Sequence, residues 1–564
     1  MERKLKGSLD SASFWLRGDP GRNATYDAIV VGSGAAGGVA AWRLCSLGLK
    51  VLVLEAGQLP ENVYRPLTAA VSAAMNALLN SGIDNRLSPT VLRVCEKALR
   101  LAGRIRQPVQ SRCFAWALSP QCLVDDVDCP YISDSEEPFH WYRSRQPGGR
   151  MLVPGHGRQY YRLGGMDGQA SKAGLPVWPF DSMELDPSYR IIERTLGLRG
   201  GEDSVNSMPG RELSEALPLS SAEKKIISTL KNRWPGARPI LGHHAPPAAW
   251  LDLAAATGRL RGRAGAVVRQ VLYSASGAAE GVEWFDCGTG QIETASAPIV
   301  FLCASAIEST RILMLSAGGT KAEAVGMHSP ALGRYLMDHA VMNAVGYTNS
   351  LPDLAGQSVE PGRCIYVPPL DEEDGPFGIQ VHIHPRSASN ARVDIVSFAD
   401  VLPDAENRVS LELTRTDAYG VPVPRILFRY SDAQRAIGRR QSEIIQQISE
   451  DLGLDHLSQT RKLAAPGTGI HECGTARMGS DPATSVVDPH NECWDVKGLY
   501  VTDGACFPRV DVHNPTLTIM ALTARAADHA VSAASRRTCE QAGSTTRFSL
   551  QSRPSRDQDS GVPG

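Results

Sequence analysis

The stretch Tyr26–Gly57, YDAIVVGSGAAGGVAAWRLCSLGLKVLVLEAG, decides the fold. It opens with the short apolar run Ala28–Val31, which is typical of a parallel strand buried on both faces. The pattern G-x-G-x-x-G follows directly. Its glycines permit a tight turn, a close approach of the backbone to a pyrophosphate, and close packing of the next helix. These glycines are Gly32, Gly34 and Gly37. We therefore expect a strand and a helix whose free N–H groups bind phosphate.

The second half of the stretch indicates which kind of nucleotide is bound. Gly48 is placed to end the helix, and Lys50–Leu54 predicts a second buried strand that leads to Glu55. A carboxylate about 20 residues after the glycines hydrogen-bonds a ribose hydroxyl in such folds. A plain glycine-rich turn is the alternative, but the two strands and the acid favour a dinucleotide with an unphosphorylated adenosine ribose. Its expected contacts are Gly32, Ser33, Gly34, Ala36, Gly37 and Glu55.

Length and composition indicate a globular protein of two domains. A chain of 564 residues exceeds a single ordinary core. With 42% hydrophobic residues and a net charge of −2, the chain offers no electrostatic argument for nucleic acid or an anionic membrane. No run reaches the roughly 18 apolar residues of a spanning helix, and the N-terminus lacks the apolar core of a signal peptide. We expect a soluble, cytoplasmic protein without nucleic-acid or membrane partners.

Neither the cysteines nor the histidine pairs indicate a metal site. The 12 cysteines include no C-x-x-C pair, which favours reduced thiols over a disulfide framework or zinc. Two histidine pairs lack partners at zinc-like spacing, and one acidic cluster lacks the glycine and distal glutamate of a calcium loop. These groups are His243 with His244, His382 with His384, and Asp125, Asp126 and Asp128. A G-x-S-x-G elbow and a Walker lysine are also missing from the sequence, which argues against hydrolase and kinase chemistry.

The middle of the chain predicts further strands and helices. Strand signals at Val267–Tyr273, Gly281–Asp286 and Ala297–Ala304, with a helix at Ile307–Leu315, form a second βαβ-like group far from the first in sequence. The cofactor domain is therefore expected to be discontinuous. Elsewhere, period-two alternation predicts an antiparallel sheet with one face exposed to solvent, and further helices are expected. The two strands are Gly378–Pro385 and Arg408–Leu413, and the helices are Leu67–Leu79, Pro89–Leu101, an amphipathic helix within Val177–Leu198, and the long, exposed Ala433–Gly453.

Two further segments have a composition typical of ligand-binding loops. Trp141–Gly168 is rich in glycine, arginine and aromatic residues, which suits a loop beside a flat anionic cofactor, although a plain surface Ω-loop is the alternative. Gly467–Asp488, GTGIHECGTARMGSDPATSVVD, precedes a strand at Leu499–Thr502 and the segment DGACFPRVDVHNPTLT. A long helix is expected to begin near Pro515, because proline suits the first helical turn.

Together, the first and last blocks resemble the glucose-methanol-choline family of flavin oxidoreductases. In that family the opening motif binds the ADP half of FAD and continues G-x-x-x-A-x-x-L-x-x-x-G, which Gly37, Ala41, Leu44 and Gly48 match. The closing block is more specific, because it combines H-x-x-G-T, V-V-D, a strand ending in D-G, and N-P-T-L-T before a helix. The correspondence spans most of the chain.

The resemblance implies two catalytic residues, His471 in HECGT and Asn514 in NPTLT. A histidine suits a base, because its unperturbed pKa is about 6.5 and a positioned base contributes typically about 10²–10⁴ in rate. An asparagine amide can donate to the substrate oxygen as that oxygen gains charge. An isolated histidine would more often be a core residue, but the two motifs favour catalysis. His513 is the competitor, although neighbours in an extended segment point opposite ways.

The resemblance also implies further cofactor contacts. The glycine pair beside the flavin is matched by Gly148, Gly149 and Arg150, the adenine contact by Val268, the phosphate and ribityl contact by Asp503 and Gly504, and the NPT segment by Asn514, Pro515 and Thr516. Ala304–Arg311 and the pair Asp338 and His339 match other family elements. Some members attach FAD to a histidine where this chain has Val153, and His156 is out of register, so we expect non-covalent FAD.

The expected function is FAD-dependent oxidation of an alcohol CH–OH to a carbonyl by hydride transfer to flavin N5. The small polyhydroxy substrate is expected to be a sugar, an amino sugar or another polyol, for example the primary alcohol of an aminoglycoside intermediate, with oxygen or another compound as electron acceptor. Asp511 could hold a cationic amino sugar or form a surface salt bridge. The alternatives are a quinone- or cytochrome-linked polyol or choline-like dehydrogenase, a hydroxynitrile-type lyase, and a non-catalytic flavoprotein.

These expectations define an α/β protein with a doubly wound, Rossmann-like FAD domain and a substrate domain on a mainly antiparallel sheet. The FAD domain is assigned to residues 25–60, 140–175, 245–340 and 465–535. The substrate domain is assigned to residues 61–139, 176–244 and 341–464, and flexible tails to residues 1–24 and 536–564.

Overall fold

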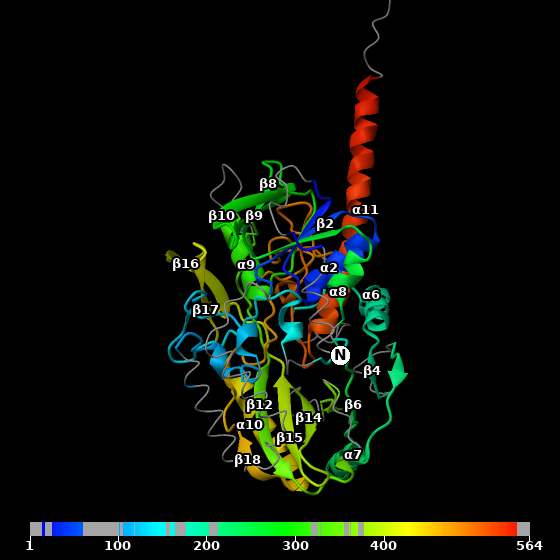
Figure 1. Ribbon diagram of the computed structural model, residues 1–564, viewed down its shortest axis with the longest axis vertical. Helices are drawn as coiled ribbons and strands as arrows, with labels where there is room; N and C mark the ends of the chain where they lie inside the picture. The colour runs from blue at the N-terminus through cyan, green and yellow to red at the C-terminus, as the bar shows by residue number, and fades with distance from the viewer. Residues whose placement is uncertain are drawn as a thin grey trace, which may run out of the picture.

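The computed structural model shows two large sheets with smaller sheets beside them (Figure 1). The parallel sheet with its helices lies at the upper end of the view, and the six-stranded antiparallel sheet lies at the lower end. The structure describes residues 14–16, 25–59, 101, 105–117, 119–153, 158–163, 176–201, 212–246, 248–316, 325–326, 329–354, 360, 362–369 and 377–549.

The parallel sheet has five strands in the order β19-β11-β1-β2-β7. The central strands are buried along their whole length, as expected where helices cover both faces of a sheet. This is the predicted doubly wound fold, and its nucleotide-binding turn follows β1. The strands are β1 (Ala28–Val31), β2 (Val51–Glu55), β7 (Leu260–Ala264), β11 (Val300–Leu302) and β19 (Leu499–Val501).

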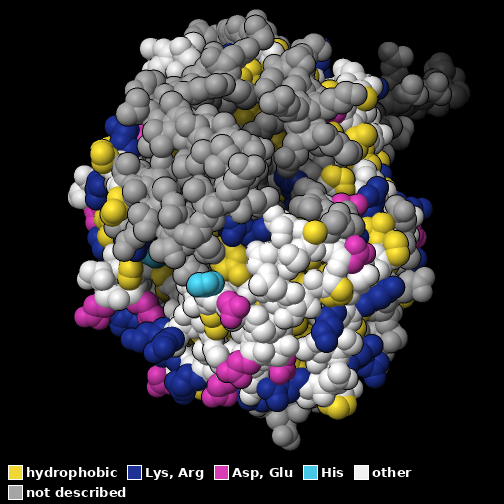
Figure 2. Space-filling model, turned by 60° about the horizontal axis from the view of Figure 1, so that its bottom comes forward, with side chains coloured by type: hydrophobic (Ala, Val, Ile, Leu, Met, Phe, Trp, Pro, Cys, Tyr) yellow, Lys and Arg dark blue, Asp and Glu magenta, His cyan; other side chains and the backbone are white. Residues whose placement is uncertain are grey.

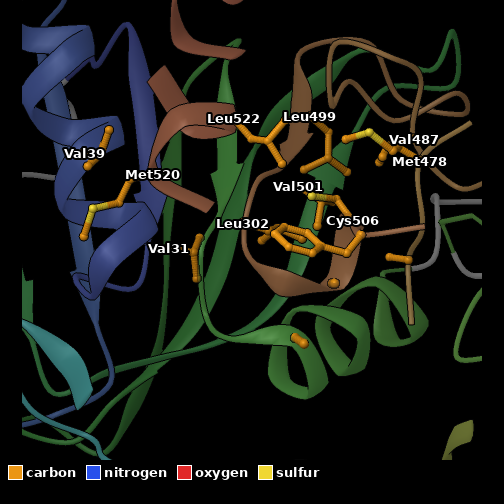
Figure 3. Close-up of a cluster of buried hydrophobic side chains, with 14 of the residues drawn as sticks. Val31, Val39, Leu302, Met478, Val487, Leu499, Val501, Cys506, Met520 and Leu522 are labelled. Carbon is orange, nitrogen blue, oxygen red and sulfur yellow. The ribbon is translucent and has the colours of Figure 1, made fainter. Parts of the chain in front are cut away.

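Alternate side chains of β1 belong to two different cores. Ala28 and Val30 pack into the cluster beneath α2 (Ala35–Ser46) and α8 (Trp250–Ala255). Ile29 and Val31 pack into the largest cluster, which also contains residues of β11, β19 and the long helix α11 (Thr516–Ser549). Figure 3 shows part of this second cluster. Its labelled side chains include Val31, Leu302, Val501, Cys506, Met520 and Leu522.

Strand order in the parallel sheet reverses next to β1. The chain runs from β1 to β2 on one side, whereas β11 and β19 lie on the other side. In open α/β sheets a ligand binds at such a switch point, outside the carboxyl ends of the strands. The segments that leave the carboxyl ends of β1, β11 and β19 are therefore the ones positioned to form the site.

The second large sheet has six antiparallel strands in the order β18-β12-β15-β14-β13-β6. Helix α10 (Asp432–Asp451) covers one face and buries Ile444, Ile445 and Ile448. The expectation of an exposed helix is therefore wrong for this face, because its apolar residues recur at helical spacing and pack on the sheet. The strands are β6 (Ile240–Leu241), β12 (Ala340–Thr348), β13 (Ile365–Val367), β14 (Phe377–Pro385), β15 (Ala391–Ala399) and β18 (Asp455–Gln459).

Smaller sheets and further helices complete the described structure. The predicted strand at Arg408–Leu413 is β16 (Arg408–Thr416), which pairs with β17 (Pro422–Leu427) in a separate three-stranded sheet completed by β3 (Ile132–Ser133). The remaining described elements include β8 (Ala266–Tyr273), β9 (Ala279–Asp286), β10 (Gln291–Ser296), β4 (Arg199–Gly200), β5 (Glu215–Ala216), α6 (Ser182–Leu196), α7 (Ser221–Arg233) and α9 (Ala306–Leu315).

Parts of the two regions assigned as flexible tails lie within the described residues. Phe14 and Trp15 are buried against Gly262 of β7, because their rings complete the core on that edge of the sheet. Helix α11 continues to Ser549 and extends beyond the body of the molecule in Figure 1. The helix thus runs through residues 536–549, which contain no proline to end it. The predicted helices Leu67–Leu79 and Pro89–Leu101 lie outside the described residues, apart from Leu101.

Within the described residues, every helix is too short or too polar to cross a bilayer. Figure 2 shows the end of the molecule that carries α10 and the six-stranded sheet, where Lys and Arg side chains lie among Asp and Glu side chains. The described part of this face therefore has no patch of a single charge.

Candidate active site

One large cavity lies between the two main sheets. Its volume is about 1210 Å³, which exceeds the roughly 300–1,000 Å³ of usual small-molecule pockets. The carboxyl-end segments of the parallel sheet form one side, and the face of the six-stranded sheet opposite α10 forms another. The cavity can therefore hold both a dinucleotide and a second molecule.

The glycine turn after β1 is pressed against its neighbours, as a phosphate-binding turn requires. Gly32 has φ 92°, and a Cβ atom there would lie 2.5 Å from the carbonyl oxygen of Cys303. A Cβ atom on Gly37 would lie 1.9 Å from the carbonyl oxygen of Gly32. Helix α2 begins after Gly34 without a side-chain cap and without an acid in its first turn. Its first N–H groups are therefore suited to an anion.

Glu55 ends β2 beside this turn and is buried. Its carboxylate accepts the N–H of Ser33 at 3.0 Å, the hydroxyl of Ser33 at 2.5 Å and the N–H of Gly57 at 2.7 Å. Burial raises the pKa of Glu55, although these hydrogen bonds act in the opposite direction. The hydroxyl of Ser33 also accepts the N–H of Gly148 at 3.0 Å, so it ties the glycine turn to the loop after Trp141.

This loop also reaches the late histidine motif. Gly149 has φ 65°, and a Cβ atom there would lie 2.8 Å from Cα of Gly34. Arg150 forms two hydrogen bonds to the carboxylate of Glu472, at 2.7 and 3.1 Å, and the Glu472 side chain is fully buried. The described part of the loop lines the cavity instead of forming a plain surface Ω-loop.

His471 and Asn514 meet in the cavity. Asn514 Nδ2 lies 3.2 Å from His471 Nε2, and the amide of Gln380 on β14 donates to Asn514 Oδ1 at 2.9 Å. All three residues line the cavity. Gln380 therefore fixes which end of the Asn514 amide faces the histidine.

A second histidine, His339, contacts the Nδ1 side of the His471 ring. His339 Nδ1 lies 2.7 Å from His471 Nδ1, and His339 Nε2 contacts the backbone carbonyl of Asp511. The ring of Phe398 packs against both imidazoles. His339 is completely buried, and burial lowers its pKa to about 4.

Asp338 holds the backbone around His471. Its carboxylate accepts the N–H of His471 at 2.9 Å and the N–H of Gly469 at 3.0 Å. The residue between them, Ile470, has φ 62°, a left-handed conformation that costs a β-branched residue of order 1–3 kcal/mol. Burial and the charge of Glu472 raise the pKa of Asp338 to about 7. The Asp338 carboxylate thus stabilises a strained turn that presents the histidine.

His513 points away from the cavity. It packs between Tyr161 and Tyr366, and its Nδ1 lies 2.7 Å from a carboxylate oxygen of Asp511. The alternation of side chains along the extended segment therefore turns Asn514, not His513, toward the cavity. Asp511 is also absent from the lining and its carboxylate is bonded to His513, so the idea that it holds a cationic amino sugar is wrong.

The other expected cofactor residues converge on the same cavity. Apart from Gly37 and Gly148, all of them line it: Gly32, Ser33, Gly34, Ala36, Glu55, Gly149, Arg150, Val268, Asp503, Gly504, Asn514, Pro515 and Thr516. Asp503 accepts the hydroxyl of Ser309 at 2.5 Å, and burial raises its pKa to about 6. Val153 is buried in a separate apolar cluster, and His156 lies outside the described residues. The roles of these residues remain predictions.

The histidine pairs have other contacts. His243 contacts the carbonyl of Gly201 at 3.0 Å, and His244 lies 3.1 Å from the carboxylate of Glu360. His382 and His384 stack on β14, with His384 3.5 Å from Asp394. In the part of the chain that the structure describes, no group of three or more His, Cys, Asp or Glu side chains could hold a metal ion.

Comparison with known proteins agrees with this architecture. Residues 403–523 match the family model of GMC oxidoreductases, and residues 30–60 match that of an NAD(P)-binding Rossmann-like domain. Paromamine 6'-oxidase of Streptomyces fradiae is 27% identical over 89% of this chain and 90% of its own. 2-Methyl-1,2-propanediol dehydrogenase of Mycolicibacterium austroafricanum is 26% identical over 73% of this chain and 85% of its own. The crystal structure of pyridoxine 4-oxidase from Mesorbium loti superposes with a TM-score of 0.57 at 17% identity, over 89% of this chain and 98% of that one, and supports the fold alone.

The comparisons identify an alcohol oxidoreductase with a dinucleotide-binding domain. Residues 403–523 match the glucose-methanol-choline (GMC) family of oxidoreductases, whose members are FAD-dependent, and the chain is similar to oxidases of aminoglycoside pathways.

Proposed function

We propose that this protein is an FAD-dependent alcohol oxidase or dehydrogenase that converts a CH–OH group of a sugar, amino sugar or other polyol to a carbonyl. The observation that carries the proposal is the contact between His471 and Asn514, which share one cavity with the expected dinucleotide contacts. A base and a hydrogen-bond donor at one point are what removal of a hydroxyl proton requires.

The residues present fit FAD. The open N-terminus of α2 suits the pyrophosphate, Glu55 suits the adenosine ribose, and Val268 suits the adenine. The wall formed by Gly149, Arg150 and Asn514 would face the flavin ring. Val153 cannot form a bond to the flavin, because its side chain has no nucleophile. Acid precipitation of the purified protein should therefore release all of its flavin, whereas flavin that stays with the denatured protein would contradict non-covalent binding.

The chain's own residues then handle the proton and the developing charge. When bound, the flavin supplies a hydride acceptor at N5. His471 takes the hydroxyl proton of the substrate at Nε2. Asn514 stabilises the oxygen as it becomes negative, through its amide hydrogens. Gln380 fixes the Asn514 amide before the reaction, so no reorientation is needed while the charge develops.

Hydroxyl-rich substrates suit the polar wall of the cavity. On the six-stranded sheet this wall includes Asn343, His382, Asp394 and Ser458. Burial acts to raise the pKa of Asp394, but hydrogen bonding to His384 and the charge of Arg392 lower it to about 2. An ionised carboxylate accepts hydrogen bonds from hydroxyl or ammonium groups. The names of the relatives, paromamine 6'-oxidase and C-glycoside 3-oxidase of Arthrobacter globiformis (29% identical over 46% of this chain and 51% of its own), support a sugar.

Anaerobic mixing with a panel of sugars, amino sugars and polyols tests the proposal. A substrate should bleach the flavin absorbance within seconds and yield one carbonyl per flavin. A panel that includes paromamine-like amino sugars, C-glycosides and simple diols and leaves the flavin oxidised would contradict alcohol oxidation, as would carbonyl formation without bleaching, which is the outcome expected of a lyase.

The electron acceptor distinguishes an oxidase from a dehydrogenase. An oxidase releases one hydrogen peroxide per substrate in air. A dehydrogenase, for which the propanediol dehydrogenase is the relative, turns over only with an added quinone or dye. Peroxide measured against carbonyl product decides between them.

A further inference from the structure

Five groups form a continuous hydrogen-bonded row through the site. The row runs from the backbone carbonyl of Asp511 to His339, then to His471, Asn514 and Gln380. Its first member is a backbone carbonyl, which can only accept a hydrogen bond. That fixed point determines the direction of the bonds that follow.

The carbonyl of Asp511 requires a proton on His339 Nε2. A second proton would make the His339 ring a cation, and this ring is fully buried beside Phe398. The nearby carboxylate of Asp511 is bonded to His513, and burial lowers the pKa of His339 to about 4. At neutral pH the Nδ1 atom of His339 therefore carries a lone pair and no proton.

The lone pair on His339 Nδ1 determines which nitrogen of His471 carries the proton. Its Nδ1 lies 2.7 Å from the His339 lone pair, so this nitrogen carries the hydrogen. A neutral His471 then has its lone pair on Nε2. That atom is 3.2 Å from Asn514 Nδ2, a donor, on the side that lines the cavity.

We propose that His339 is a positioning residue that sets the tautomer of His471, so that the basic nitrogen of His471 faces the substrate. The inference rests on the proposed role of His471 as the base. When the substrate hydroxyl gives its proton to Nε2, His471 carries protons on both nitrogens. Its Nδ1–H still donates to His339 Nδ1, which stabilises the cation. A base held in the wrong tautomer loses about 10⁴ in rate in a serine-protease triad.

Two substitutions of His339 separate this role from simple packing. His339→Asn keeps an acceptor at the δ position and an amide donor, whereas His339→Leu keeps a similar volume without an acceptor. The flavin-loaded, full-length variants are mixed anaerobically with the substrate found in the panel. Flavin reduction should slow by about 10² or more in His339→Leu with a KM within about threefold of the wild type, and by less than about tenfold in His339→Asn.

The pH profile provides a readout that packing alone would not move. Loss of the acceptor for Nδ1–H disfavours the His471 cation, so the acid limb of the reduction rate should shift to lower pH in His339→Leu and stay in place in His339→Asn. The charged or titratable groups around the two imidazoles in the described chain include Asp338, Glu472 with Arg150, Asp511 with His513, and Asp400 with Arg509 near Asp511. All of them are retained in both variants.

Neutron diffraction on the wild-type protein tests the tautomer without activity. Deuterium on His471 Nδ1 and His339 Nε2 is the expected result, and this measurement stands even if His339→Leu fails to fold. Deuterium on His471 Nε2 alone would overturn the inference, as would a His339→Leu variant with the wild-type rate and pH profile. If His471→Ala itself keeps the wild-type rate, the proposed function fails instead.

Discussion

Partly or fully buried histidines make the stability of this protein sensitive to acid. Burial lowers the pKa of His140, His339 and His382 to about 4. In the unfolded chain a histidine has a pKa of about 6.5. Between these two values the unfolded state binds protons that the folded state does not. Each histidine therefore makes the free energy of unfolding fall as the pH drops from about 6.5 to about 4.

Replacing His382 isolates this effect at one residue. In His382→Gln the side chain cannot take up a proton in the unfolded state, so the variant should gain of order 1 kcal/mol over the wild type when the pH falls from 7.5 to 5. Urea unfolding at the two pH values measures the difference. His490→Gln, at an exposed histidine, is the control. An identical stability difference for His382→Gln at both pH values would contradict the lowered pKa.

Helix α2 packs closely against β1 because residue 37 is a glycine and has no Cβ atom. A Cβ atom on Gly37 would lie 1.9 Å from the carbonyl oxygen of Gly32. Gly37→Ala should therefore push the helix from the strand, destabilise the protein by about 1–3 kcal/mol or more, and lower its flavin content. Gly236→Ala is the matched control, because a Cβ atom there meets nothing within 4 Å. Thermal unfolding and flavin absorbance check both variants, and a stable, fully loaded Gly37→Ala would contradict the close packing.

At the level of elements, local sequence patterns predicted the parallel sheet well. Strand β1 has the predicted bounds, and β2 begins one residue later and ends one residue later than expected. A continuous apolar run between glycines is a strong local signal. The error on α10 has a clear cause, since its charged residues suggested solvent although Ile444, Ile445 and Ile448 form a buried stripe. Strand pairing, such as β16 with β17 in a sheet of its own, had no local signal.

The candidate site was predictable only where a motif carried it. His471 and Asn514 came from their motifs, and the fold brings them within 3.2 Å. Gln380 lies 134 residues before Asn514 on a strand that its alternation predicted, but no motif marked Gln380 itself as a site residue. His339 had a weak signal in the Asp338-His339 pair, but its contact with His471 depends on the tertiary packing around Phe398.

Across the whole molecule, one ion pair joins an N-terminal segment of the site to a C-terminal one. Arg150 and Glu472 are separated by 322 residues in sequence, and Glu472 is fully buried. Removing either partner leaves the other charge uncompensated in or beside the cavity. The pair therefore couples the loop beside the glycine turn to the motif that presents His471.

A double-mutant cycle measures this coupling. Arg150→Met and Glu472→Met should each destabilise the protein by about 2–4 kcal/mol, and the double variant should lose much less than the sum. The exposed pair Arg440–Glu443, at 3.3 Å, is the control and should contribute no more than about 1 kcal/mol. Additive losses for Arg150 and Glu472 in urea unfolding would show that the two segments are not coupled through this pair.

The role of His471 as the base is tested most directly by the rate of flavin reduction by substrate in His471→Ala, measured by anaerobic stopped flow against the wild type at matched flavin content. The expected rate is lower by about 10²–10⁴, with His490→Ala unchanged, because the base that accepts the hydroxyl proton is gone. A flavin-loaded His471→Ala that reduces at the wild-type rate would contradict this role.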